Sequence, residues 1–219
     1  MSSKQFKVVI AGEFGSGRSA FAARSVEGKT SKNKIASIKA EVYPIKFYTS
    51  AGTADVNLYD TTLHAKGGLP DDGFFRQADA CILMYDTTKQ SSYDALGKWY
   101  DGFYKSNHKR GTEEQPVIVV GTKVDDIKGR DIKPKDNDFA RKKGLKYVEI
   151  SAKANYGVQE LYLELAKALM GAGVQFTDMI ELAKPDIATV DTEALEKVMK
   201  EYEDLSKVSP IDFGPSYSI

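Results

Sequence analysis

Residues 12–19, GEFGSGRS, have the spacing of a phosphate-binding loop in which one position is changed. Glycines allow backbone N–H groups to turn toward an anion, and the start of the following helix adds positive potential. The pattern G-x-x-x-x-G-K-[ST] has lysine where this chain has arginine. The residues expected to surround a phosphate are Gly12, Gly15, Gly17, Arg18 and Ser19. The sequence therefore predicts an anion site whose cationic side chain is unusual.

Further polar residues follow apolar runs that are expected to be strands. Asp60 closes the run 54–60, residues 122–125 (TKVD) follow another run, and residues 151–153 (SAK) follow a third. In an open α/β sheet, ligands bind beyond the carboxyl ends of the strands. We therefore expect these motifs to meet residues 12–19 at one edge of a sheet.

The elements that position these motifs follow from hydrophobic periodicity. Strands are expected near residues 6–11, 40–49, 54–60, 79–85, 117–121 and 146–150. Helices are expected near residues 18–26, 69–77, 92–106, 134–143 and 155–170. Strands that alternate with helices indicate a doubly wound, mostly parallel α/β sheet. The short segment 50–53 between the second and third strands instead suits an antiparallel hairpin.

The pattern changes after Gly171, which divides the chain into residues 1–171 and residues 172–219. Residues 172–190 lack a long periodicity and are interpreted as an extended linker. Asp191 then offers an N-cap for an amphipathic helix, because apolar residues recur on one helical face from Leu195 onward. We expect this helix to dock on the core domain or on a partner.

Composition limits the class of protein. Lys plus Arg and Asp plus Glu are each 31, so the net charge is zero and a general nucleic-acid binder is not expected. The basic run 141–143 is more typical of a solvated helix face than of a binding site. Cys81 is the single cysteine, which favours a reducing compartment. No apolar run is long enough to span a bilayer and no C-terminal cysteine is present for prenylation, so we expect an intracellular protein of cytoplasm or nucleus without a membrane anchor.

With these motifs in this order, the chain resembles the small GTPases of the Ras superfamily, and most closely their Ran group. Residues 41–49, Trp99, residues 140–145 and the C-terminal helix carry the similarity to Ran. The resemblance implies a P-loop NTPase G domain with a six-stranded, mostly parallel sheet and helices on both faces. It also implies GTP or GDP with Mg²⁺ as the ligand. The acidic tail of Ran is absent, and the segment between Trp99 and Pro116 is longer.

The resemblance assigns roles to individual residues. The guanine base would be bound by Thr122, Lys123, Asp125, Ser151, Ala152 and Lys153. The metal would be bound by Ser19, Ser37 and Asp60. Thr122 replaces the usual asparagine, although a Rho-type branch also has threonine there. Taken alone, Asp125 could be a solvated loop acid, and Ser19 and Asp60 could simply cap a helix and a loop.

The end that would meet the γ-phosphate departs from the family. Arg18 replaces the phosphate-binding lysine, Phe14 stands where active relatives have a small residue, and Leu63 replaces a glycine. His64 stands at the place of the glutamine that positions the attacking water, and no other catalytic residue is assigned. Hydrolysis is therefore expected to be very slow or absent.

Three functions remain open. The first is a Ran-like pseudo-GTPase that acts as an interaction or scaffold subunit, with nucleotide held statically or lost. The second is a slow Ran-like switch that binds transport-receptor-like proteins in its GTP state. The third is a structural subunit of a larger assembly without a ligand. Each implies protein partners rather than nucleic acid.

Overall fold

The computed structural model describes residues 3–24, 35–36, 41–60, 74–107, 115–185, 190–198 and 200. The strands are β1 (Lys4–Ala11), β2 (Ile35–Ala36), β3 (Glu41–Thr49), β4 (Gly52–Asp60), β5 (Ala80–Asp86), β6 (Val117–Thr122), β7 (Lys146–Ile150) and β8 (Phe176–Asp178). The helices are α1 (Arg18–Arg24), α2 (Gln90–Asp94), α3 (Leu96–Asn107), the 3₁₀ turn η3 (Pro134–Asp136), α4 (Asp138–Lys143) and α5 (Val158–Met170). The chain thus alternates between strands and helices, as expected.

The described strands form one sheet in the order β2-β3-β4-β1-β5-β6-β7, and β8 also pairs with β3. Strands β1, β4, β5, β6 and β7 are parallel, whereas β3 runs antiparallel to β4. Thr49 pairs with Gly52, so the predicted hairpin turns through two residues. All six predicted strands are present, and the short strands β2 and β8 are additions that the sequence analysis did not predict.

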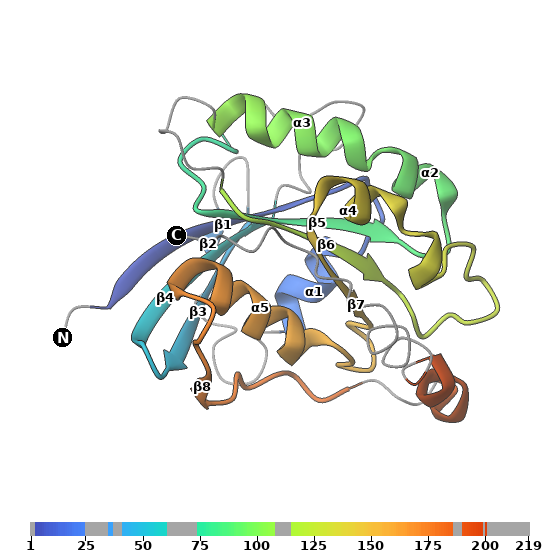
Figure 1. Ribbon diagram of the computed structural model, residues 1–219. Coiled ribbons are helices and arrows are strands. Elements are labelled where there is room, and N and C mark those ends of the chain that lie inside the picture. The colour runs from blue at the N-terminus through green and yellow to red at the C-terminus, as the bar shows by residue number, and fades with distance from the viewer. Residues whose placement is uncertain are drawn as a thin grey trace.

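Helices cover both faces of the sheet: α2, α3 and α4 lie above it and α1 and α5 below it in Figure 1. Residues of β1 alternate between two apolar cores because successive side chains point to opposite faces. Val8 and Ile10 join the core with α1 and α5, whereas Val9 and Ala11 join the core with α3. The central strands are therefore buried on both sides, which explains their β-branched composition.

Four expected helices differ from the structure. The expected helix 92–106 is divided at Ala95 into α2 and α3, and the expected helix 134–143 is divided at Asn137 into η3 and α4. The described part of the expected helix 69–77, residues 74–77, is a turn. Helix α5 begins at Val158 rather than near residue 155, because Asn155 and Gly157 have left-handed φ angles of 59° and 69°. A Cβ at Gly157 would lie 2.0 Å from the backbone oxygen of Glu149, so glycine is required where the chain passes β7.

Between Val174 and Lys184, the segment after Gly171 packs on the domain. Strand β8 pairs with the end of β3, between Asp178 and Tyr48. Asp191 caps the C-terminal helix as predicted, since its carboxylate accepts a hydrogen bond of 3.0 Å from the N–H of Ala194. Residues 192–198 are helical, and Leu195 is buried. The sequence pattern therefore changes at residue 171, but residues after this position still contact residues before it.

Cys81 lies in β5 with its thiol buried, as the sequence indicated. Burial raises the pKa of this thiol far above its usual range, so the side chain stays protonated and behaves as a small apolar group. Within the described segments, no helix has the length and apolar character needed to cross a membrane.

Candidate nucleotide-binding site

The phosphate loop (residues 12–19) connects β1 to α1 and depends on glycine at close contacts. Gly12 has a φ of 144°, and a Cβ there would lie 2.1 Å from the backbone oxygen of Met84. At Gly17, where φ is 87°, an added Cβ would lie 3.3 Å from the hydroxyl oxygen of Thr122. No other residue fits Gly12 without displacing β5, so the loop is fixed against the centre of the sheet.

Beside the phosphate loop lies a cavity of about 440 Å³, which we call the base cavity. It is lined by Gly17, Ala20, Thr122, Lys123, Asp125, Asp126, Ile150, Ala152 and Lys153. Most of the residues assigned to the guanine base therefore meet here, at the carboxyl ends of β6 and β7. A cavity of this size is in the range that binds small molecules.

Thr122 links the phosphate loop to strands β5 and β6 at the edge of the base cavity. Its buried hydroxyl lies 2.8 Å from the backbone oxygen of Ser16 and 3.0 Å from that of Tyr85, and its single proton is shared between these two carbonyls. The Thr87 hydroxyl in turn donates to the backbone oxygen of Thr122 at 2.8 Å. Threonine at this position thus connects the loop to two strands by side-chain hydrogen bonds.

Lys123 is held by an acid that the sequence analysis did not identify. Its ammonium nitrogen lies 2.6 Å from Oδ2 of Asp86, whose side chain is fully buried while that of Lys123 is 41% exposed. Burial disfavours the Asp86 carboxylate, but hydrogen bonds from Lys123 and Thr88 outweigh it and lower the Asp86 pKa. Lys123 has a left-handed φ of 61°, and the ion pair fixes its side chain at the wall of the base cavity.

A hydrogen bond from Ser151 orients the Asp125 carboxylate. The Ser151 hydroxyl donates to Oδ1 of Asp125 at 2.6 Å and accepts from the N–H of Ala154 at 3.0 Å. Ser151 is fully buried, whereas Asp125 lies at the cavity wall. A carboxylate fixed in this way can face the two N–H donors on one edge of guanine.

Ser19 and Asp60 lie together as the sequence predicted for a metal site. The Ser19 hydroxyl donates to Oδ2 of Asp60 at 2.6 Å, and Asp60 is almost fully buried. Their oxygens fit Mg²⁺, which prefers hard oxygen ligands, because serine keeps its lone pairs while its proton is on the bond to Asp60. Over the described residues, no group of three or more His, Cys, Asp or Glu side chains could hold a metal.

Arg18 is buried against helix α3. Its guanidinium carbon lies 5.6 Å from the ring centroid of Trp99, and only 2% of the residue is exposed. The Trp99 N–H donates to a carboxylate oxygen of Glu13 at 3.0 Å. Burial lowers the Arg18 pKa despite the opposing effects of Asp60 and Glu13, and the group remains charged because arginine starts so high. We call Arg18, Trp99 and Glu13 the arginine cluster.

Sequence reasoning did not identify Glu13 as a site residue and used Trp99 only as a mark of family resemblance. Phe14, predicted to crowd the γ-phosphate end, is 73% exposed on the phosphate loop. Ser37, Leu63 and His64 lie outside the described residues. Their proposed roles therefore stay predictions.

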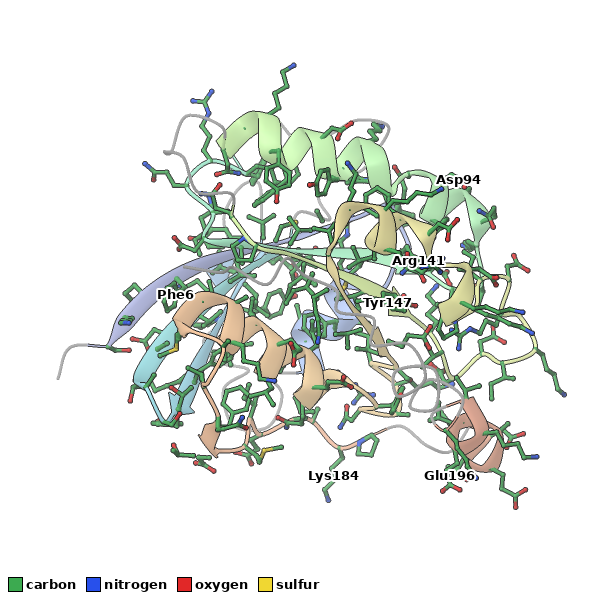
Figure 2. The ribbon with its side chains drawn as sticks, viewed as in Figure 1. Phe6, Asp94, Arg141, Tyr147, Lys184 and Glu196 are labelled. Atoms are coloured by element: carbon green, nitrogen blue, oxygen red, sulfur yellow. The ribbon has the colours of Figure 1, made fainter. Side chains whose placement is uncertain are left out.

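Arg24, at the end of α1, joins the base cavity to the C-terminal linker. Its guanidinium donates to the backbone oxygens of Lys153 at 3.1 Å and Lys184 at 2.7 Å. The Arg24 carbonyl accepts from the N–H of Ala183 at 2.9 Å, and the Asn155 amide donates to the Ala183 carbonyl. The Lys184 side chain itself points outward (Figure 2). No sequence signal marks this contact, because all the linker's acceptors are backbone groups.

A glycine loop between a buried strand and a helix, beside a sheet-edge cavity with a Thr-Lys-x-Asp loop, defines a P-loop GTPase fold. The sequence model described as "Ras family" matches residues 7–171. The chain belongs to the Ras family and is a small GTP-binding protein by that membership. Proteins of this family generally bind guanine nucleotide with Mg²⁺.

Proposed function

We propose that this Ras-family chain is a Ran-like pseudo-GTPase that acts as an interaction or scaffold subunit. Guanine nucleotide is bound statically, or its binding has been lost. The burial of the Arg18 guanidinium against Trp99 carries the proposal, because the side chain expected to neutralise the β- and γ-phosphates is packed inside the domain. Lysine is a compact charge on a slim stem, whereas the wide guanidinium stacks readily on aromatic rings.

The base end supports retention of a guanine ligand. Asp125 and Lys123 line one cavity and are each fixed by a neighbouring side chain. The Ser19–Asp60 pair keeps oxygens that suit Mg²⁺. These residues would hold the base and the cation, and the cation would supply charge neutralisation at the phosphates.

The sequence at the other end argues against ordinary turnover. Phe14, Leu63 and His64 replace residues that normally leave room for the γ-phosphate and position water. Loss of an arginine-finger route alone reduces the rate by about a thousandfold or more. Several such changes at one end of the ligand favour a protein that presents a surface to partners rather than one that cycles.

The Ran-like assignment, the partners and the compartment rest on sequence similarity. Residues 41–49 and Trp99 carry that similarity. Protein partners of a transport-receptor type, or a larger assembly in cytoplasm or nucleus, fit a neutral chain without a general nucleic-acid-binding charge. The second candidate, a slow Ran-like switch in nucleocytoplasmic transport, is favoured by the intact Ser19–Asp60 pair.

The test begins with purified protein, from which nucleotide is released by denaturation and identified by chromatography. Added GTP is then followed in a single-turnover assay. We expect bound guanine nucleotide that is not hydrolysed during long incubation, or no nucleotide at all. Rapid conversion of GTP to GDP refutes the pseudo-GTPase, whereas slow but measurable conversion supports the switch.

A triple variant tests whether the changed residues at the γ-phosphate end cause the loss of binding or hydrolysis. Arg18→Lys with Phe14→Gly and His64→Gln should raise nucleotide binding or turnover if these positions alone are responsible. Lys142→Met, at an exposed position on α4, is the control and should leave both unchanged. A triple variant that behaves like the parent shows that the defect lies elsewhere in the chain.

A further inference from the structure

The arginine cluster occupies the interior rather than the open side of the phosphate loop. Arg18 is 2% exposed and Trp99 is also 2% exposed, so the guanidinium lies between the loop and helix α3. Arg18 is the one lysine or arginine in residues 12–19. The loop's own positive side chain is therefore kept off the surface that a phosphate would approach.

The charges around Arg18 hold it there. Asp60 and Glu13 both stabilise the charged guanidinium, and Trp99 fixes Glu13 through its N–H. Arg18, Asp60 and Glu13 together carry a formal charge of −1, because one guanidinium faces two carboxylates. An incoming phosphate would meet an arginine that is already balanced, and drawing it outward would leave carboxylates beside a second anion.

Among the described residues, the base cavity lies at the other end of the site. The base cavity is lined by Gly17 from the phosphate loop, and neither Arg18 nor Ser19 lines it. Its polar wall consists of Thr122, Lys123, Asp125, Asp126 and Lys153. The hollow thus matches a nucleoside better than it matches a chain of phosphates.

We infer that Trp99 and Glu13 are positioning residues that hold Arg18 against α3, so that the site recognises guanine nucleotides without a phosphate contact from this side chain. This inference rests on the proposed function, and it specifies the ligand class as guanosine mono- and diphosphate. The loop N–H groups, and a Mg²⁺ ion held by Ser19 and Asp60, would still favour the diphosphate.

The experiment measures the ratio of GDP to GMP affinity by isothermal titration of the full chain in Mg²⁺. A ratio between two ligands does not change if a variant lowers the folded fraction, so it separates positioning from stability. Arg18→Gln keeps polar N–H groups but removes the charge. If Arg18 does not contact phosphate, this change alters the ratio by less than about threefold.

The other variants should increase the ratio. Arg18→Lys frees a slim cation from the indole, and we expect the GDP to GMP ratio to rise by about tenfold. Glu13→Gln retains an acceptor for Trp99 but removes a charge, and Trp99→Phe removes the N–H donor; each should raise the ratio several-fold. Phe103→Leu, in the same core on α3, is the control and should leave the ratio unchanged.

Each result decides the question. A fall of more than threefold in the ratio for Arg18→Gln shows that Arg18 binds phosphate and overturns the inference. So does a wild-type chain that binds neither ligand. Hydrolysis of GTP would refute the proposed pseudo-GTPase without altering these ratios, so the two failures can be told apart.

Discussion

Lys123→Met should destabilise the fold through the acid that it leaves behind. The Lys123 ammonium and the Asp86 carboxylate lie 2.6 Å apart, and the Asp86 side chain is fully buried. Methionine keeps an unbranched apolar stem like that of lysine but removes the charged end. The buried carboxylate then keeps only its hydrogen bonds from Thr88.

The expected magnitude lies between two limits. Exposed ion pairs contribute about 0.2–1 kcal/mol, whereas breaking a fully buried pair costs about 3–5 kcal/mol. Because the Lys123 side chain is 41% exposed and the Asp86 side chain is not exposed, water screens one partner only. We therefore expect a coupling free energy of about 1–3 kcal/mol.

The assay is a double-mutant cycle in urea at neutral pH, with Lys123→Met, Asp86→Asn and the double variant. Lys123→Met should lose most of its effect in the Asp86→Asn background. Lys142→Met is the matched control, because Lys142 pairs with Asp138 at 3.5 Å with both side chains more than half exposed. A coupling below about 0.5 kcal/mol would refute the reasoning.

The pH dependence gives an independent check. The folded-state pKa of Asp86 is lowered, so the pair stabilises the fold above the unfolded aspartate pKa of about 3.9. That stability is lost as the pH falls through the lower, folded-state pKa. The difference between wild type and Lys123→Met should therefore be present at pH 7 and shrink in acid.

Further predictions concern the other buried polar groups. Thr122→Val removes the hydroxyl that joins loop to strand and should lower the free energy of unfolding by about 1–3 kcal/mol in urea, with faster nucleotide release. Arg130→Met should cost about 3–5 kcal/mol, because it leaves the buried Glu149 carboxylate without its cation, and adding Glu149→Gln should restore part of the loss. Ser151→Ala frees the Asp125 carboxylate and should weaken GDP binding by about tenfold in titration.

The sheet could be predicted from sequence because its central strands are buried on both faces. The run Val117–Thr122 has that composition, and its parallel neighbours share it. Strand β8 could not be predicted in this way, because three residues at an edge are defined by their partner on β3 rather than by their own pattern. The 3₁₀ turn η3 separates from α4 where Asn137 becomes an N-cap, which the continuous periodicity concealed.

The candidate site likewise contains residues that could be predicted from the sequence and residues that could not. Residues near one another in sequence, such as those of the Thr-Lys-x-Asp loop, were assigned to the base end, and they line one cavity. Asp86 and Glu13 were missed because their roles depend on contacts with Lys123 and Trp99, far away along the chain. The direction taken by the Arg18 side chain likewise depends on an indole that only the folded chain brings within reach.

Trp99 is the single tryptophan of the chain, and it lies where the phosphate loop meets α3. Its intrinsic fluorescence therefore comes from one place, with a cation over the ring and a carboxylate on its N–H. Any ligand that moves Arg18 or Glu13 alters the electric field on that ring. The tryptophan fluorescence of the unlabelled protein thus reports on the phosphate loop alone, because the chain has no other indole.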